Sequence, residues 1–128
     1  MDLYKLRQID FQHKDSRGSL TQLVHEGFKQ INVLESNAGS IRGAHYHKKS
    51  VEAFYLITGS VEVEFKGHER SEKVTFHQGD FFEIRPDVLH NMYFPEFCLM
   101  VQMYDKPVEN KDGTKDIYTE EEFNARNC

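Results

Sequence analysis

Three residues that can hold a metal or move a proton fall within eight positions of one another: His45, His47 and Glu52. The two histidines are two apart, and alternate residues of a β-strand face the same side, so both imidazoles project from one face of a predicted strand. Glu52 opens the next predicted strand in phase with Phe54 and Leu56. If those apolar side chains face an interior, Glu52 meets the histidines across the hairpin.

A fourth candidate, His90, comes 38 residues after Glu52 on a later predicted strand. Three imidazoles and one carboxylate that meet inside a barrel would bind a divalent transition metal such as Zn, Fe, Mn or Ni. The alternative is that these histidines only satisfy backbone groups, because a His-x-His pair arises freely by chance. The remaining histidines have no spacing partner, and we expect them on the surface or in turns: His13, His25, His68 and His77.

The elements that must position these residues are short strands. Val61, Val63 and Phe65 alternate with Glu62 and Glu64, which is typical of a strand with one buried face. Further runs between glycine or proline turns predict strands over 19–24, 30–35, 53–58, 60–65, 72–76, 80–84, 89–94 and 97–104. This pattern indicates an all-β antiparallel sandwich or small barrel.

One convincing helix is predicted, at the end of the chain. In "YTEEEFNAR" (118–126), Thr119 can cap the helix, and Glu122 lies three residues further on as its capping-box partner. Residues 105–116 form the longest loop and lead to this helix. We therefore expect one domain over residues 1–128, with a β core at about 20–104 and a loop and short helix over 105–128.

Charge and composition exclude several classes of partner. The net charge is −5 and the sequence pI about 5.8, without a basic cluster, which argues against nucleic acid. No apolar run is long enough for a bilayer, and the N-terminus lacks the pattern of a signal peptide, so we expect a cytoplasmic protein without a membrane partner. Cys98 lies in an apolar run and Cys128 is the last residue, so no disulfide framework is expected.

The spacing of these residues resembles the cupin superfamily. The segment Gly39-x5-His45-x-His47-x4-Glu52-x6-Gly59 reproduces its first motif. The second motif, G-x5-P-x-G-x2-H-x3-N, is matched at Gly79 and His90, whereas Arg85, Asp87 and Phe94 replace its proline, glycine and asparagine. The resemblance covers about residues 20–104 and implies a jelly-roll barrel. It also implies that the four metal-ligand positions are those of His45, His47, Glu52 and His90.

Two segments narrow the resemblance to cupins that act on nucleotide sugars. "IRGAHYHKK" (41–49) and "DSRGSLTQL" (15–23) are similar to blocks of the thymidine-diphosphate-sugar 3,4-ketoisomerases, the 4-keto-sugar 3,5-epimerases and the cupin domain of capsule-sugar epimerases. This implies isomerisation or epimerisation of a nucleotide-linked keto sugar for surface-polysaccharide or deoxysugar synthesis. It further implies diphosphate contacts from Arg17 and Arg42, and catalytic roles for His45 and His47. Strand phase alone places Arg42 opposite the histidines, and Arg17 reads equally well as a turn arginine.

The resemblance contains a conflict between two chemistries. The ketoisomerases and 3,5-epimerases that the chain resembles are generally metal-independent, whereas all four ligand positions are filled here. A metal-bound His45 or His47 cannot also be a free general base. The resemblance to the capsule-sugar epimerase cupin domain, which carries a metal site, relieves this conflict best. It implies that the ion would polarise the keto oxygen, and that a nearby Tyr, Glu or His outside the ligand set would move the proton. Tyr55, Tyr93 and Tyr104 are the candidate tyrosines. Each of these tyrosines can equally be an aromatic filler of the barrel wall.

Two other functions stay open at this stage. One is a metal-dependent cupin of different chemistry, such as a dioxygenase or a sugar-phosphate isomerase. The other is a non-enzymatic module that binds a small acid or sugar. Whatever the chemistry, a small barrel has an edge that needs covering. Exchange of the N-terminal strand "MDLYKLRQIDF" between two subunits would cover it, so we expect a homodimer.

Overall fold

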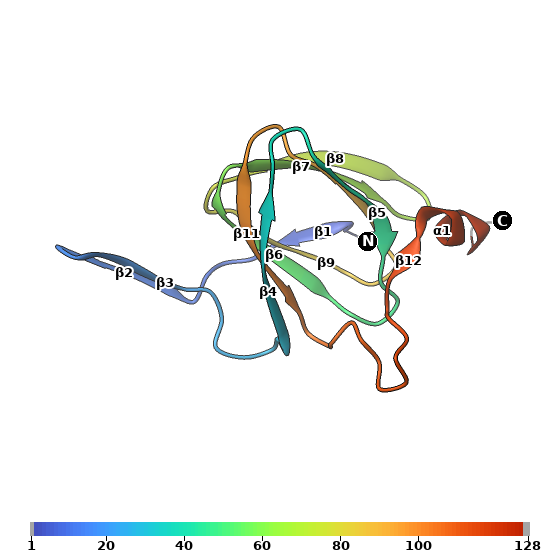
Figure 1. Cartoon of the computed structure of the whole chain (residues 1–128), viewed down its shortest axis with the longest axis horizontal. Helices are drawn as coiled ribbons and strands as arrows, with labels where there is room; N and C mark the ends of the chain where they lie inside the picture. The colour runs from blue at the N-terminus through green and yellow to red at the C-terminus, as the bar shows by residue number, and fades with distance from the viewer. Residues whose placement is uncertain (1, 127–128) are drawn as a thin grey trace.

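The computed structural model describes residues 2–126 as a chain of short strands that ends in a helix (Figure 1). The elements are β1 (Tyr4–Leu6), β2 (Phe11–Asp15), β3 (Gly18–Gln22), β4 (Gln30–Ser36), β5 (Ile41–Tyr46), β6 (Glu52–Thr58), β7 (Ser60–Lys66), β8 (Ser71–His77), β9 (Phe81–Ile84), β10 (Leu89–Tyr93), β11 (Cys98–Tyr104), β12 (Tyr118–Thr119) and α1 (Glu120–Arg126). Every predicted strand is present. The short β1 lies within the expected N-terminal strand, whereas β2 and β12 were not predicted.

Two antiparallel five-stranded sheets form the barrel. Their strand orders are β1-β9-β6-β11-β4 and β12-β5-β10-β7-β8. A third sheet pairs only β2 with β3, and we call this hairpin, residues 11–22, the arm. Figure 1 shows the arm projecting from one side of the barrel, while α1 lies on the opposite side. The expected all-β jelly-roll architecture with a short C-terminal helix is confirmed.

The two sheets enclose an aromatic core. Phe54 and Leu56 point inward from β6 and are almost fully buried, as are Phe76 and Phe82. The rings of Phe76 and Phe82 stack with centroids 3.8 Å apart. Burying one such side chain stabilises the fold by about 1.5–3 kcal/mol. The alternation that predicted the strands therefore also orients Glu52, which is in phase with Phe54, toward the interior.

Two turns show why particular residues are required. Gly59 joins β6 to β7 with φ +87°, and a Cβ there would lie 2.1 Å from the carbonyl oxygen of Phe97. Asp87 occupies the glycine position of the second cupin motif and has φ +67°. It is the single non-glycine residue with positive φ in the described part of the chain. Aspartate tolerates this left-handed conformation better than most residues, which explains how the departure from the motif is accommodated.

The C-terminal helix has the predicted cap. The Thr119 hydroxyl accepts the N–H of Glu122 at 3.1 Å, and the Glu122 carboxylate accepts the N–H of Thr119 at 3.2 Å. Phe123 is buried and packs with Tyr46 and Leu89, which point outward from β5 and β10. The helix therefore covers the outer side of the two strands that carry the histidines.

The N-terminal strand completes a sheet edge within one chain. β1 pairs with β9, with Tyr4 opposite Ile84. The edge that we expected an exchanged strand to cover is thus covered by the chain's own β1, and the homodimer stays a prediction. No helix of residues 2–126 is long and apolar enough to cross a membrane. Cys98 is a buried free thiol, and Cys128 lies outside the described residues.

Candidate metal centre and active site

The four residues expected to form a ligand set meet inside the barrel. His45 and His90 are direct partners in the β5–β10 ladder, Glu52 begins β6, and His47 follows β5. One nitrogen of each imidazole and one carboxylate oxygen of Glu52 all lie within 4.8 Å of one another. His47, Glu52 and His90 are buried, and His45 is partly exposed. We call these four residues the cluster.

The outer nitrogen of each imidazole is bound to a backbone carbonyl. His45 Nδ1 lies 3.1 Å from the carbonyl oxygen of Gly43, and His90 Nδ1 lies 3.1 Å from that of Val88. His47 Nδ1 lies 2.5 Å from the carbonyl oxygen of Asp116. A carbonyl only accepts hydrogen bonds, so each Nδ1 carries a proton and donates it. Nε2 of each imidazole therefore faces the cluster, and it presents a lone pair there whenever that imidazole is neutral.

The two carboxylate oxygens of Glu52 face different partners. Its Oε2 accepts hydrogen bonds from Gln102 Nε2 at 2.7 Å and from the Tyr104 hydroxyl at 2.9 Å. Its Oε1 faces the imidazoles, 3.1 Å from His47 Nε2 and 3.0 Å from His90 Nε2. Gln102 is held in turn by Asn32 Nδ2 at 2.9 Å. These contacts orient the carboxylate so that Oε1 faces the imidazoles.

This donor set fits a divalent transition metal. Three Nε2 lone pairs and one carboxylate oxygen are typical ligands of such ions, and their outer atoms have the hydrogen bonds that usually orient metal ligands. His47 and His90 Nε2 lie 3.0–3.1 Å from Glu52 Oε1, close enough for these atoms to share one ion with bonds of about 2.0–2.1 Å. The residues present can therefore hold an ion without large rearrangement.

His45 and His47 differ in pKa because their surroundings differ. Burial, followed by the charge of His90, lowers the pKa of His45 to about 4, so this imidazole is neutral at pH 7. Burial also opposes the charged form of His47, but its hydrogen bond to Glu52 prevails and raises the pKa above the usual value. Burial opposes ionisation of Glu52 too, and the two imidazole hydrogen bonds nevertheless hold its pKa well below its usual range. Glu52 is thus ionised and favours the protonated form of His47, whereas His45 is a neutral base.

Arg42 lies on the same face as the histidines, contrary to the prediction from strand alternation. His45 is opposite His90, but Arg42 is opposite Met92, so two residues of β5 face the single residue Asn91. This β-bulge shifts the phase of the strand by one residue, and opposed residues of a ladder share a face. The guanidinium of Arg42 reaches across to β4, where it donates to Ser36 Oγ at 2.9 Å and to the Glu35 carbonyl at 2.8 Å.

Arg17, the other predicted phosphate contact, lies outside the barrel of its own chain. It sits at the tip of the arm between β2 and β3, where its side chain is 86% exposed. Its guanidinium binds the neighbouring Asp15 at 2.6 Å. Figure 1 shows that the arm points away from the barrel. A single chain therefore does not bring Arg17 to the cluster.

Of the three tyrosines considered for proton transfer, Tyr104 reaches the cluster. Its ring lies 5.3 Å from that of His47. Burial, and then the charge of Glu52, raise the pKa of Tyr104, so the hydroxyl keeps its proton at neutral pH. Tyr55 packs with Phe81 on the outer face of its sheet. Tyr93 is also on an outer face, because it alternates with the inward-facing Met92. Tyr55 and Tyr93 therefore match the alternative of an aromatic residue in the barrel wall.

The histidines without a spacing partner lie on the surface, as predicted. His13, His25, His68 and His77 are all exposed. His13 and His25 form ion-pair contacts at the arm and its base, with Asp15 and Asp10 respectively. None of the four joins the cluster.

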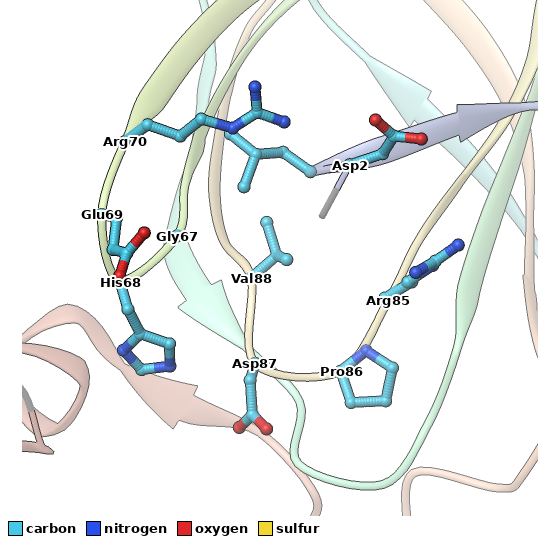
Figure 2. Close-up of a pocket in the computed structure, with 10 residues that line it drawn as sticks. Asp2, Gly67, His68, Glu69, Arg70, Arg85, Pro86, Asp87 and Val88 are labelled. Atoms are coloured by element: carbon cyan, nitrogen blue, oxygen red, sulfur yellow. The ribbon is translucent and has the colours of Figure 1, made fainter.

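A cavity of about 670 Å³ lies between the β7–β8 turn, the N-terminal segment and the β9–β10 loop. Figure 2 shows Val88 at its centre, with Arg70, Arg85 and Asp2 around it. No cluster residue lines this cavity. The β9–β10 loop separates the two, because Asp87 N–H donates to the His47 carbonyl at 2.7 Å and the Val88 carbonyl accepts from His90.

Three residues that support the cluster were missed from the sequence: Asn32, Gln102 and Asp116. Asn32 and Gln102 occupy inward positions of predicted strands, so a polar residue at an inward position was an available signal. Asp116 lies in a loop, 69 residues from His47. It contacts His47 through a backbone carbonyl, which every residue possesses, so no sequence signal could have identified that contact.

Comparisons with known proteins agree with this architecture. Among curated proteins, none matches the chain. The solved 3,4-ketoisomerase QdtA from Thermoanaerobacterium thermosaccharolyticum, in complex with TDP, is 18% identical with a TM-score of 0.78, over 97% of this chain and 93% of that one. A 3,4-ketoisomerase from Helicobacter canadensis is 19% identical with a TM-score of 0.78, over 96% of both chains. The TDP-quinovose 3,4-ketoisomerase WlaRB from Campylobacter jejuni is 18% identical with a TM-score of 0.77, over 96% and 98%.

These likenesses establish the fold that the strand pattern and motif spacing predicted. A family model described as the polysaccharide biosynthesis C-terminal domain matches residues 13–119, from within β2 to the end of β12. The chain therefore has the cupin fold and belongs to the polysaccharide biosynthesis C-terminal domain family.

Proposed function

We propose that this protein is an enzyme that isomerises or epimerises a nucleotide-linked keto sugar by moving a proton on a carbon beside the ketone. Its family and the solved ketoisomerases of the same fold support this assignment. The observation that carries it is the convergence of three Nε2 atoms and Glu52 Oε1 inside the barrel. Arg42 lies on the same inner face, where it suits the diphosphate of such a substrate.

The reaction needs a base at neutral pH, and the structure offers His45. With a pKa lowered to about 4, its Nε2 is unprotonated at pH 7 and can take a proton. It is also the least buried imidazole of the cluster, and therefore the most open to a substrate. His47 and Glu52 remain paired with each other, and His45 is held through Nδ1 by the Gly43 carbonyl. Tyr104, which keeps its proton, is available as a donor.

We further propose that the cluster binds a divalent transition metal, with His45, His47, Glu52 and His90 as ligands. When bound, such an ion supplies a Lewis acid that polarises the ketone oxygen. Three fixed Nδ1–H donors leave three lone pairs facing one point, an arrangement that a single proton-transferring imidazole does not need. In the loaded protein His45 is a ligand rather than the base, so metal content decides between the two roles.

The position of Arg17 supports a homodimer in which each arm serves the partner's barrel. Several apolar side chains of the single chain are exposed: Phe11 and Leu20 on the arm, and Ile31 and Val33 on the outer face of β4. A second copy would bury them and bring Arg17 to a diphosphate in its barrel. Light scattering should give twice the mass of the chain, and a monomer would contradict this proposal. The cytoplasmic location stays a prediction.

One experiment tests the reaction and the metal together. Purified protein is analysed for Zn, Fe, Mn and Ni, and a TDP-linked 4-keto-6-deoxy sugar is incubated with it in heavy water. We expect deuterium beside the ketone, abolished in His45→Gln and retained in His77→Gln, whose histidine is exposed on β8. Exchange that survives complete metal removal would assign His45 as the base. Absence of exchange in both loaded and stripped protein would contradict the proposed function.

The complete set of three histidines and one glutamate also favours a second candidate, an iron-dependent dioxygenase. Such a ligand set leaves coordination positions open on an iron ion. The same preparations, loaded with Fe²⁺, are therefore tested for oxygen consumption. Consumption of oxygen without deuterium exchange would replace the first proposal by the second.

A further inference from the structure

The loop from β11 to α1 is built into the wall of the cluster. We call residues 105–119 the strap. At its beginning, the Asp105 carboxylate accepts the N–H of Val51 at 2.8 Å. At its end, β12 adds to the edge of the second sheet, with Thr119 opposite His45. The strap therefore contacts both ends of the connection between β5 and β6, which begins with His47 and leads to Glu52.

Asp116 is the buried anchor of the strap. Its side chain is 2% exposed, and its carboxylate accepts three consecutive backbone N–H groups. Oδ1 binds Lys48 N at 2.8 Å, and Oδ2 binds Lys49 N and Ser50 N at 3.0 Å each. These residues form the turn between the two ligand positions. A carboxylate that satisfies three buried donors holds their backbone in one conformation.

The backbone carbonyl of the same residue accepts the hydrogen bond from His47 Nδ1. Asp116 N–H donates to the Val108 carbonyl at 2.8 Å, which fixes the peptide from the other side. The side chain and the carbonyl belong to one residue, so the turn and the His47 ring cannot shift independently. Gly43 and Val88, the other carbonyl partners of the cluster, are each two residues from their own histidine. Of the three histidines of the cluster, His47 is the one whose carbonyl partner comes from a distant segment.

We propose that Asp116 is a positioning residue: its carboxylate anchors the strap to the turn between His47 and Glu52, and its carbonyl keeps the proton of His47 on Nδ1 so that Nε2 faces the cluster. One consequence rests on the proposed function: the cluster binds a divalent metal tightly only while the strap is docked. The tautomer of His47 is a consequence that requires neither metal nor substrate.

The test compares Asp116→Ala with Asp112→Ala. Asp112 lies on the same strap but is exposed and bonds only to the neighbouring Thr114. In metal-free, ¹⁵N-labelled protein at alkaline pH, long-range ¹H–¹⁵N spectra report which nitrogen of His47 carries the proton. We expect Nδ1–H in the wild type and in Asp112→Ala, and a mixture of tautomers in Asp116→Ala. Calorimetric titration with Zn²⁺ should show an affinity about 10- to 100-fold lower for Asp116→Ala alone.

A measurement on the wild-type protein tests the proposal even if the Asp116→Ala variant does not fold. If the docked strap and the metal stabilise each other, Zn²⁺ should slow amide exchange at Asp116 and over 48–50, but not at Asp112. Equal tautomer and equal Zn²⁺ affinity in folded Asp116→Ala would overturn the proposal, as would amide exchange that Zn²⁺ leaves unchanged. Should the wild type bind no Zn²⁺, the metal proposal fails by itself, and the His47 tautomer still decides the role of Asp116.

Discussion

The cluster and the arm differ in how completely one chain supports them. In the cluster, each imidazole has a carbonyl partner and Glu52 accepts four contacts from surrounding residues. In the arm, Phe11 and Leu20 are about half exposed, and Arg17 binds only Asp15 of its own hairpin. A site whose groups are fixed in the single chain is pre-organised for its ligand. A two-stranded hairpin without a packing partner is marginally stable, so the arm needs a second surface.

The largest effect should come from Glu52→Gln, which tests the self-sufficiency of the cluster. We expect Zn²⁺ affinity to fall by about 100-fold or more and stability by about 3 kcal/mol, because His47 loses the buried carboxylate that pairs with its charge. Calorimetry and thermal unfolding measure the two effects. Glu62→Gln, which removes an exposed pair with Lys73, is the matched control and should change neither quantity appreciably.

The next largest effect tests whether the arm acts in the partner's barrel. We expect Arg17→Ala to lose most of its activity because its KM for the nucleotide sugar is higher. Glu52→Gln should be inactive. The two variants are then mixed and allowed to exchange subunits. Each mixed dimer has one barrel in which the cluster is intact and the arm supplied by the partner subunit is also intact. Activity should then return to about a quarter of the wild-type value. If Arg17 served its own barrel, mixing would restore nothing.

A smaller effect distinguishes His47 from His25, the two histidines whose pKa values are raised. The pKa of His47 is raised mainly by Glu52, against burial, and that of His25 near the arm is raised by its hydrogen bond to Asp10. Below its pKa, His47 must release a proton when a metal binds, so apparent metal affinity should rise as pH increases through that value. Calorimetry in buffers of different ionisation enthalpy should detect up to one proton released at pH 6.5. His25→Gln should leave that number unchanged, and a change would contradict the assignment to His47.

The smallest effect concerns the turn of the arm. Gly18 has φ +135° and no neighbouring atom that would meet a Cβ. Gly18→Ala should therefore cost about 1 kcal/mol of local backbone strain. Because no residue of the arm belongs to a hydrophobic core cluster of the described chain, we expect faster amide exchange in residues 11–22 without a lower midpoint of global unfolding. A lower global midpoint would show that the arm and the barrel unfold as one unit.

Much of the cluster could be predicted because its ligands lie on regular hairpins. His45 and His47 share a strand face, Glu52 keeps the phase of Phe54, and alternation predicts their direction without knowledge of the fold. The same reasoning was wrong for Arg42, because the bulge opposite Asn91 changes the phase. A bulge depends on the pairing of β5 with β10, residues far apart in sequence, and leaves no mark in the alternation of β5.

Sequence by itself determined the strand content, the C-terminal helix with its Thr119 cap, and three of the four cluster residues on one hairpin. Local periodicity and turn chemistry are sufficient for these features, because each depends on residues that are neighbours along the chain. Only the tertiary structure decided that Arg42 faces inward, that Tyr104 rather than Tyr55 or Tyr93 reaches Glu52, and that Asp116 supports His47. These contacts join segments from different parts of the chain, and one of them uses a backbone carbonyl, whose role is set by where the chain passes in space.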